Sequence, residues 1–320
     1  MIDVRHQINF LGEMYMGNPV LTVIIASYNF GSYLVDAVDS VLAQNTQFPF
    51  QIIILDDCSN EKSQEYLEKC RLKSPSIISV VQPEHNCGYA RELMFRMRPE
   101  VNTKYIAYLD GDDFWYSDNK IETQVSFLES NKDFVASCHK TLIYKGKNRK
   151  DHGLYGGYKI GEGYIKEWDI RHVIAHKHKL YHHVSSYIFR NIFIQKDGFF
   201  LPDIMRYPIF LGDVNLAMLY LRQGGKVRFF NELLSIYRYT EKGIWSKEDE
   251  RLQLEILLLQ KLSMDLITKK NYHDTFIREY ETLLKEYKEI YGEDLSHINY
   301  NVKLDDIKDF KLMRGIRQIF

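Results

Sequence analysis

The chain has few of the features that mark membrane-spanning, secreted or nucleic-acid-binding proteins. Nowhere in its 320 residues do roughly 18 apolar residues run together, so the sequence predicts no transmembrane helix. Residues 1–17 carry acidic and polar side chains and no long apolar stretch, which is unlike a signal peptide. The 42 basic and 43 acidic side chains leave a formal net charge of −1, so nucleic acid is not an expected partner.

Cysteine is also scarce. The four cysteines (Cys58, Cys70, Cys87 and Cys138) show no spacing typical of a metal site, and free thiols in a reducing cytosol are the simplest interpretation. What the chain does have is length. Its 320 residues can bury a large core, in one domain or in one domain with an appendage.

Strand and helix patterns alternate along the first part of the chain. Uninterrupted apolar runs predict buried strands over residues 20–26, 51–55, 77–81 and 105–109. Helical spacing of apolar residues predicts one helix with Ser32 as its N-cap. Two further helices are predicted over residues 61–73 and 88–97. This alternation is typical of an α/β fold in which helices cover both faces of a mostly parallel sheet.

A polar cluster follows each predicted strand. The clusters are Ser27 to Asn29, Asp56 with Asp57, Asn86 to Arg91, and Asp110 to Asp113. Ligands of parallel α/β sheets bind beyond the carboxyl ends of the strands. We therefore expect the four clusters to line one ligand site along that edge of the sheet.

Three carboxylates, Asp110, Asp112 and Asp113, follow the fourth predicted strand with one glycine among them. Like charges in so small a space resist joint ionisation, and a bound divalent cation removes that conflict. Mg²⁺ and Mn²⁺ select oxygen ligands, and magnesium-type ions are usually held by one or two carboxylates together with substrate phosphates. A diphosphate is therefore the expected ligand, although an acidic turn after a strand remains the simpler alternative for this motif alone.

The pattern becomes irregular in the middle of the chain and wholly helical from residue 247. Strands are predicted over residues 134–144, 227–230 and 233–239, and a helix over residues 213–223. Two long amphipathic helices follow, and residues 304–320 form a shorter basic amphipathic segment. That segment could rest on an anionic membrane surface, on the domain or on another subunit.

These patterns suggest three regions. Residues 1–19 form an N-terminal extension and residues 247–320 a helical C-terminal region. Between them, residues 20–246 form one domain, with a nucleotide-binding half over residues 20–115 and an acceptor and catalytic half over residues 116–246.

Five motifs in a fixed order resemble glycosyltransferase family 2, inverting enzymes of the GT-A fold that use nucleotide sugars. The motifs are Ser27-Tyr28-Asn29, Asp56-Asp57-Cys58-Ser59, Asn86-Cys87-Gly88-Tyr89-Ala90-Arg91, Asp110-Gly111-Asp112-Asp113 and Gly212-Asp213. The family has glycine in place of Cys58 and more often glutamate in place of Gly212. The likeness covers residues 20–246, and the presence of five motifs in this order argues against chance.

The resemblance implies a Rossmann-like GT-A sheet and a role for each matching residue. Asp57 would accept a hydrogen bond from a uracil or thymine imide, and Asp110 would lie near the ribose. Asp112 would bind Mn²⁺ or Mg²⁺ between the two phosphates, with Asp110 as a second candidate ligand. The candidate nucleotide-sugar-binding residues as a set are Ala26, Ser27, Tyr28, Asn29, Asp57, Asn86, Gly88, Arg91, Asp110, Gly111 and Asp112.

The resemblance also implies that Asp213 is the general base. It opens a predicted helix whose N-terminus stabilises the ionised carboxylate, and an N-cap role is the alternative for that position. Asp113, His183 and Trp245 are candidates for the acceptor or lid side of the site. His172 and His176 are spaced for a helical zinc pair, but no nearby cysteine or carboxylate completes a recognisable ligand set.

The sequence thus predicts a metal-dependent inverting glycosyltransferase. It would move a single sugar from a nucleotide diphosphate, with UDP-sugar favoured, to a hydroxyl of a saccharide or lipid-linked acceptor in cell-surface polysaccharide or glycolipid synthesis. The alternative is a catalytically inactive nucleotide-sugar-binding or scaffold protein of the same fold. A dinucleotide-dependent oxidoreductase is disfavoured, because no Gly-x-Gly-x-x-Gly follows the first strand.

The same resemblance suggests where the protein works. Nucleotide sugars are cytosolic, so we expect a cytoplasmic protein. Peripheral contact with the inner face of the plasma membrane and homo-oligomerisation through the C-terminal helices both remain open at this stage.

Overall fold

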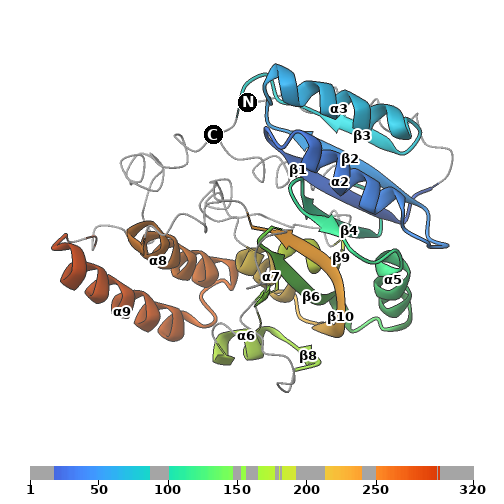
Figure 1. The fold of residues 1–320 in the computed structure, drawn as a ribbon. Helices are drawn as coiled ribbons and strands as arrows, with labels where there is room; N and C mark the ends of the chain where they lie inside the picture. Colours follow the sequence, from blue (N-terminus) through green and yellow to red (C-terminus); the bar gives the residue numbers. More distant parts are fainter. Residues whose placement is uncertain are drawn as a thin grey trace. The chain divides into compact units, whose positions relative to one another are not determined.

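A computed structural model of the chain describes residues 18–86, 101–146, 153–155, 165–176, 180, 182–191, 213–239, 250–293 and 295. The chain forms two compact units (Figure 1). The first comprises Met1–Phe199 with Gln223–Tyr239 and contains the sheet. The second comprises Phe200–Arg222 with Thr240–Phe320 and is helical in its described part.

The first half of the sheet is parallel. Strands β1 (Leu21–Ser27), β2 (Phe50–Asp56), β3 (Ile78–Val81) and β4 (Tyr105–Asp110) pair in the order β3-β2-β1-β4. Every residue of β1 is buried, because helices and loops cover both faces of an apolar strand in such a sheet. The four strands predicted from the sequence are confirmed, with boundaries shifted by one residue or less.

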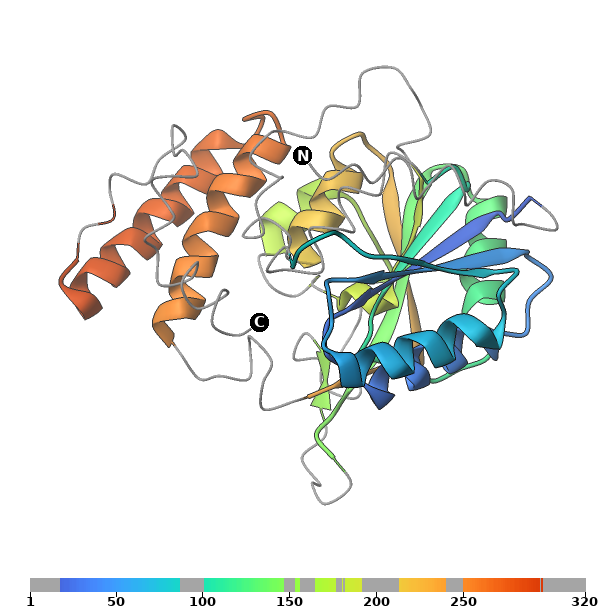
Figure 2. The same ribbon diagram turned by 90° about the horizontal axis from the view of Figure 1, so that it is seen from above.

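Helices α2 (Ser32–Leu42) and α3 (Glu61–Lys73) lie side by side on one face of this half (Figure 2). Asn60 caps α3, since its side chain accepts a hydrogen bond from the backbone N–H of Ser63. The predicted N-cap of α2 was wrong by one residue. Gly31 holds that position with a φ of 57°, a conformation that favours glycine, and Ser32 is the first helical residue.

The second half of the sheet mixes strand directions. Its members are β5 (Phe114–Trp115), β6 (Phe134–Tyr144), β7 (Gly153–Leu154), β8 (Glu167–Trp168), β9 (Ile188–Arg190) and β10 (Lys226–Arg238). Strand β9 lies between β4 and β6 and is antiparallel to both, whereas β6 and β10 are parallel. Helices α5 (Lys120–Ser130) and α6 (Ile170–His176) and the single turn η4 (Val184–Ser186) complete the unit.

Strand β10 replaces the two short strands predicted over residues 227–230 and 233–239. Its pairing with β6 shifts register between Phe230 and Leu233, where Asn231 and Glu232 are exposed. These two polar residues separate the predicted strands in the sequence, but in the structure they form an irregularity within one strand, as β-bulges do. The ten-stranded sheet with flanking helices and a helical C-terminal region confirms the predicted α/β class.

The second unit contains α7 (Asp213–Leu221), α8 (Glu250–Ile267) and α9 (His273–Tyr291). Helices α8 and α9 pack together through a buried polar contact in which the Tyr287 hydroxyl donates to Glu255 over 2.8 Å. Among the described residues, no helix is long and apolar enough to cross a membrane. The predicted helix over residues 88–97 and the amphipathic segment 304–320 lie outside the described residues.

Candidate active site

The carboxyl ends of β1, β2 and β4 meet at one edge of the sheet. Ser27 pairs with Asp56 and Ala26 with Asp110, so the polar residues that follow each strand leave the sheet side by side. Two backbone bonds continue the pairing past the strands. Asp57 N–H donates to Ser27 O over 2.9 Å, and Gly111 N–H donates to Ala26 O over 2.8 Å. The expected common edge for these clusters is therefore present.

The turns after β1 and β2 are locked together by side chains. Asn29 accepts a hydrogen bond from Asn60 N–H at its Oδ1, over 2.7 Å, and its own N–H donates to Ser59 Oγ over 2.8 Å. Asp56 is fully buried and accepts from the Ser59 hydroxyl over 2.6 Å, which fixes the second turn. Asp56 thus supports the turn that presents Asp57.

Asp57 and Asn86 lie next to each other at this edge, because Asn86 Nδ2 donates to the backbone carbonyl of Asp57 over 2.7 Å. Between them in sequence, Cys58 has a φ of 60°, a region that L side chains rarely adopt. The backbone explains why glycine suits this position in the resembling family. The Cys58 thiol donates to Pro83 O over 3.1 Å, and burial, then Asp57 and Asp56, raise its pKa.

Gly111 is required by close packing between β4 and the β1 turn. A Cβ atom at this position would lie 2.7 Å from Ala26 O and 2.9 Å from Phe30 Cδ2. Real Cβ contacts are essentially never that short, and the first of these neighbours is backbone. Glycine therefore lets the acidic turn pack closely against the carboxyl end of β1. Asp113 N–H closes this turn by donating to Asp110 O over 2.9 Å.

Asp113 is the buried member of the acidic turn. Its Oδ1 accepts from Arg238 N–H and its Oδ2 from the Ser185 hydroxyl, each over 2.9 Å. Burial raises the pKa of Asp113 well above the ordinary value for aspartate, and the charges of Asp112 and Asp110 raise it further, while the two donors act in the opposite direction.

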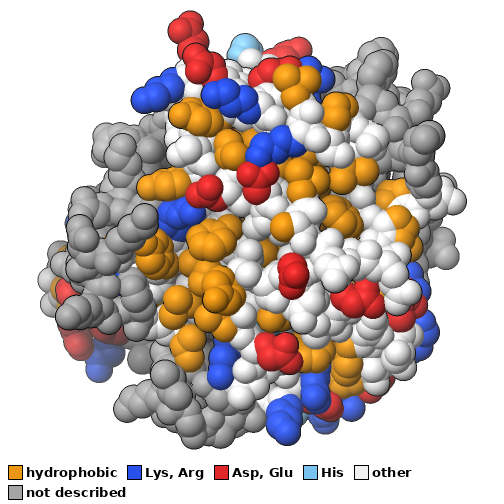
Figure 3. All heavy atoms as spheres, turned by 45° about the vertical axis from the view of Figure 1, so that its right-hand side comes forward, with side chains coloured by type: hydrophobic (Ala, Val, Ile, Leu, Met, Phe, Trp, Pro, Cys, Tyr) orange, Lys and Arg blue, Asp and Glu red, His pale blue; other side chains and the backbone are white. Residues whose placement is uncertain are grey.

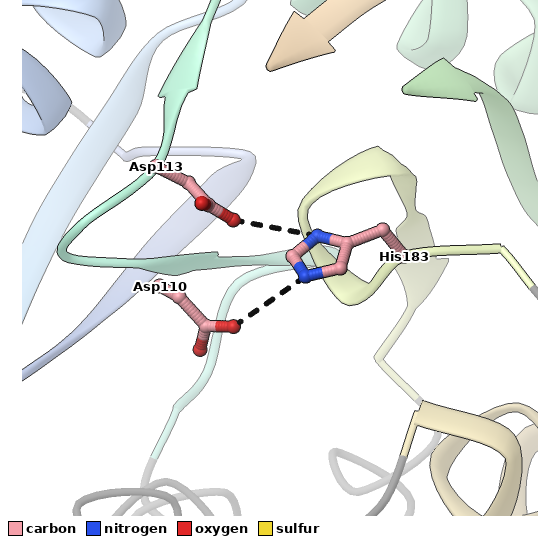
Figure 4. Close-up of side chains that lie close together, drawn as sticks. All are labelled: Asp110, Asp113 and His183. Atoms are coloured by element: carbon pink, nitrogen blue, oxygen red, sulfur yellow. Dashed lines mark ion pairs between the residues drawn. The ribbon is translucent and has the colours of Figure 1, made fainter. Parts of the chain in front are cut away.

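His183 brings a nitrogen donor to the same turn (Figure 4). Its Nδ1 lies 3.4 Å from Asp113 Oδ2 and its Nε2 lies 3.8 Å from Asp110 Oδ2. Ligand atoms of Asp110, Asp113 and His183 all lie within 4.8 Å of one another. Among the described residues this is the group of side chains whose donor set fits a divalent cation.

The sheet topology explains why His183 reaches Asp110. Because β9 runs antiparallel to β4, with Ile188 opposite Ala107, the residues just before β9 lie beside the carboxyl end of β4. Trp115 Nε1 donates to Ser185 O over 3.1 Å and holds the η4 turn in place. Sequence reasoning placed His183 only near an acceptor pocket, since nothing local indicates a contact with the acidic turn.

Arg238 is a residue of this site that the sequence did not single out. Its backbone meets Asp113, its Nη1 donates to Asp112 O over 2.9 Å, and its Nη2 pairs with Asp36 over 2.9 Å. The available sequence signal for Arg238 was that Ile236-Tyr237-Arg238 resembles a family segment downstream of the general base. For Ser185 the sequence signal was weaker, namely its position two residues after the candidate His183. No sequence pattern pointed to Asp36.

The remaining predicted site residues lie in other parts of the chain. Asp213 is the first residue of α7 in the second unit. Gly88, Arg91 and Trp245 lie outside the described residues. His172 of the predicted zinc pair contacts Asp169 Oδ1 through Nδ1 over 2.8 Å, and the side chain of His176 is outside the described set.

Comparison with known proteins places the chain in a family. The family model described as "Glycosyl transferase family 2" matches residues 22–199. TuaG of Bacillus subtilis, provisionally assigned as a teichuronic acid biosynthesis glycosyltransferase, is 36% identical over 110 residues, which are 34% of this chain and 42% of TuaG. The matches cover between 22% and 54% of the length of the curated relatives.

The solved structures that share the fold include two with bound nucleotide sugars. TarS of S. aureus in complex with UDP-GlcNAc has a TM-score of 0.58 and 16% identity, over 89% of this chain and 77% of the TarS chain. The mannosyltransferase PcManGT of Pyrobaculum calidifontis, in complex with GDP-Man and Mn²⁺, has a TM-score of 0.51 and 13% identity, over 98% of this chain and 89% of that chain. With the family model covering more than half of the residues and the acidic turns at the expected sheet edge, the chain belongs to glycosyl transferase family 2.

Proposed function

We propose that this protein is a metal-dependent inverting glycosyltransferase. It moves a single sugar from a nucleotide-diphosphate donor, with UDP-sugar favoured, to a hydroxyl group of a saccharide or lipid-linked acceptor. The observation that carries the proposal is the convergence of Asp57, at the end of β2, with Asp110 and Asp112, at the end of β4, on either side of the parallel strand β1 in a family 2 chain. Ligands of such sheets bind at that edge.

The choice of donor and pathway is supported by the relatives. TarS was solved with UDP-GlcNAc, and TuaG is assigned to teichuronic acid synthesis. We therefore assign this chain a UDP-sugar donor and a role in building a cell-surface polysaccharide or glycolipid. Its acceptor would be displayed at the inner face of the plasma membrane, which the protein would meet as a cytoplasmic enzyme.

Donor recognition is assigned to the turns after β1 and β2. Asp57, held by the buried Asp56 turn, accepts a hydrogen bond from the imide N–H of uracil. The backbone and side chains of Ala26 to Asn29 border the ribose and phosphates, and Asn86 closes the side next to Asp57. Gly88 and Arg91 are assigned to the phosphates on the family resemblance.

Asp112 and Asp110 would hold Mn²⁺ or Mg²⁺ at the end of β4. PcManGT was solved with Mn²⁺, which supports this choice. When bound, such an ion neutralises the negative charge that develops on a departing diphosphate. Gly111 and Asp113 keep the two ligands in place, because Gly111 fits only without a side chain and Asp113 is bonded from both oxygens.

Asp213 is the proposed general base. It is the first residue of α7, the position that the family resemblance assigns to the base. It removes the proton from the acceptor hydroxyl as the oxygen attacks the anomeric carbon on the face opposite the leaving diphosphate. This inverts the anomeric configuration, and such a base contributes typically ~10²- to 10⁴-fold to the rate.

A nucleotide-release assay tests the proposal. The protein is incubated with UDP-sugars and GDP-sugars, Mn²⁺ and a lipid-linked acceptor mixture, and released nucleotide is measured. We expect turnover with at least one UDP-sugar, a loss of ~10²-fold or more in kcat for Asp213→Asn, and a loss of both binding and turnover for Asp112→Asn. Asp39→Asn, on the exposed side of α2, is the matched control and should behave as wild type.

Two results would contradict the assignment. Equal nucleotide release by the wild type and by Asp112→Asn on every donor would contradict the proposal that the reaction depends on a metal ion at Asp112. Tight UDP-sugar binding without turnover on any acceptor would instead support the inactive nucleotide-sugar-binding alternative.

A further inference from the structure

His183 is a buried histidine whose two ring nitrogens face two different carboxylates. Its side chain is 4% exposed, and Figure 4 shows the ring between Asp113, on the Nδ1 side, and Asp110, on the Nε2 side. A buried imidazole in this position is constrained by more than one element. It therefore has a defined orientation toward the end of β4.

The contact between Nε2 and Asp110 is too long for a hydrogen bond. The two atoms lie 3.8 Å apart, whereas an N–H···O bond spans about 2.7–3.2 Å. Two ligand atoms that bind one ion at about 2.1 Å lie roughly 3 Å apart when adjacent and roughly 4.2 Å apart when opposite. The observed gap falls within that interval, so Nε2 and Asp110 Oδ2 are separated as two ligands of one cation would be.

In the candidate metal group, both carboxylate oxygens of Asp113 already accept hydrogen bonds, which favours support of His183 over direct binding of the ion. Its Oδ1 already accepts from Arg238 N–H and its Oδ2 from the Ser185 hydroxyl. The same Oδ2 lies 3.4 Å from His183 Nδ1. Histidines that bind metals commonly donate their other ring N–H to a carboxylate, which fixes the ring and its tautomer.

Nδ1 has two competing neighbours. Ser185 N–H donates to an unprotonated Nδ1 over 3.3 Å, and Asp113 Oδ2 lies 3.4 Å away, close enough for its charge to favour a proton on Nδ1. A cation at Nε2 excludes a proton there and so places the proton on Nδ1, facing Asp113. Metal binding therefore selects one of two tautomers that the protein can hold.

Aromatic rings fix the imidazole from its sides. The Tyr237 ring lies 4.8 Å and the Tyr155 ring 4.9 Å from the His183 ring, centroid to centroid. Tyr237 belongs to β10 and Tyr155 follows β7, so the ring is held by elements distant in the sequence. Such support reduces the entropy that the side chain loses when it binds a ligand.

We propose that His183 Nε2 is a ligand of the divalent cation beside Asp110, and that Asp113 is the positioning residue that holds the Nδ1 proton. This inference rests on the proposed function, which supplies the cation but assigns it only carboxylate ligands. The added nitrogen donor makes the site favour Mn²⁺ over Mg²⁺, because imidazole suits transition metals whereas carboxylate and water suit Mg²⁺.

Pulsed EPR of Mn²⁺ bound in the presence of UDP provides a readout that does not depend on catalysis. A nitrogen atom that coordinates Mn²⁺ gives couplings that oxygen ligands do not. We expect histidine nitrogen couplings in the wild type, their loss in His183→Asn, and their retention in His172→Asn, a matched control whose side chain is 44% exposed on α6. Labelling histidine with ¹⁵N identifies the source of the couplings.

Metal titrations add a second measurement. We expect His183→Asn to weaken Mn²⁺ binding about 10- to 100-fold and to reduce the preference for Mn²⁺ over Mg²⁺. Asp113→Asn should weaken Mn²⁺ to a similar extent while the nitrogen couplings persist, since the ligand itself remains. A thermal melt of each variant without metal separates this effect from misfolding.

The outcomes separate this inference from the proposed function. Bound Mn²⁺ without histidine couplings in the wild type, or unchanged Mn²⁺ affinity in His183→Asn, would overturn the role of His183 and leave the glycosyltransferase assignment standing. A wild type that binds no Mn²⁺ with UDP would overturn both.

Discussion

At the scale of single residues, the site depends on positions whose backbone allows only certain side chains. Asn29 and Cys58 both have positive φ values, 56° and 60°, in the two turns that border the proposed donor site. Asparagine tolerates this conformation, whereas cysteine is an unusual choice. Gly111 is constrained differently, because space is lacking around it.

Gly111→Ala should therefore destabilise the protein. A Cβ there would lie 2.7 Å from a backbone oxygen, and forced overpacking costs about 1–3 kcal/mol. The displaced turn would also shift Asp110 and Asp112, so Mn²⁺ and UDP binding should weaken together. Urea unfolding followed by circular dichroism measures the first effect and calorimetry the second.

Gly153→Ala is the matched control for that substitution. A Cβ at Gly153 meets nothing within 4 Å, so its free energy of unfolding should stay within about 0.5 kcal/mol of the wild type. Equal stability of the two variants would show that the crowding at Gly111 relaxes without cost.

At the scale of elements, a stack of rings joins β8, β10 and the segment before η4. The His182 ring lies 5.1 Å from Trp168 and 4.7 Å from Phe229, nearly parallel to both. Burial lowers the pKa of His182 to about 3, from an ordinary value of 6.5. His182 thus belongs to the core, and its neighbour His183 faces the acidic turn because the two side chains point to opposite sides of an extended segment.

The pKa of His182 gives the stability a pH dependence. Below pH 6.5 the unfolded chain protonates His182 while the folded protein keeps it neutral, so acid favours unfolding. His182 alone should lower the free energy of unfolding by about 1.4 kcal/mol for each pH unit as the pH drops from 6.5 toward 3.

His182→Phe should reduce that slope, since phenylalanine can occupy the stack without titrating. Free energies of unfolding by urea at several pH values between 4 and 8 provide the measurement. At pH 8 the residue is neutral in both states, so the difference there reports packing alone. Parallel pH profiles for the two proteins would refute the shifted pKa.

At the scale of the whole molecule, charge is balanced, because the 42 basic side chains nearly equal the 43 acidic ones. On the face drawn in Figure 3, Lys and Arg side chains lie among Asp and Glu, with hydrophobic side chains gathered between them. With a net charge of −1, the protein has no general attraction for polyanions. Recognition of the proposed nucleotide-sugar donor would then come from a local arrangement such as the end of the parallel strands.

Ligand binding at that edge should stabilise the protein. A ligand that binds only the folded state adds about 2.7 kcal/mol to the free energy of unfolding at about a hundredfold excess over its Kd. UDP with Mn²⁺ should therefore raise the Tm. Asp112→Asn should keep the ligand-free Tm, because Asp112 is partly exposed, and lose the shift.

Differential scanning fluorimetry with UDP alone, Mn²⁺ alone and both together tests this prediction. A shift as large in Asp112→Asn as in the wild type would place the ligand elsewhere. Asp39→Asn serves again as the exposed control.

The sequence by itself determined the strands, the edge and the family. Buried parallel strands are continuous apolar runs, and such runs are local, so β1, β2 and β4 and the polar residues that end them could be predicted. The order of the motifs indicated the family. The family in turn pointed to Asp57, Asp110 and Asp112 as candidate site residues.

Only the tertiary structure decided which distant residues complete the acidic turn. His183 and Asp113 are far apart in sequence, and they meet because β9 enters the sheet antiparallel to β4. Arg238 arrives because β10 pairs with β5, so that Ile236 lies opposite Phe114. A short strand such as β9, three residues long, leaves little periodic signal, and strand direction is set by pairing across the whole sheet.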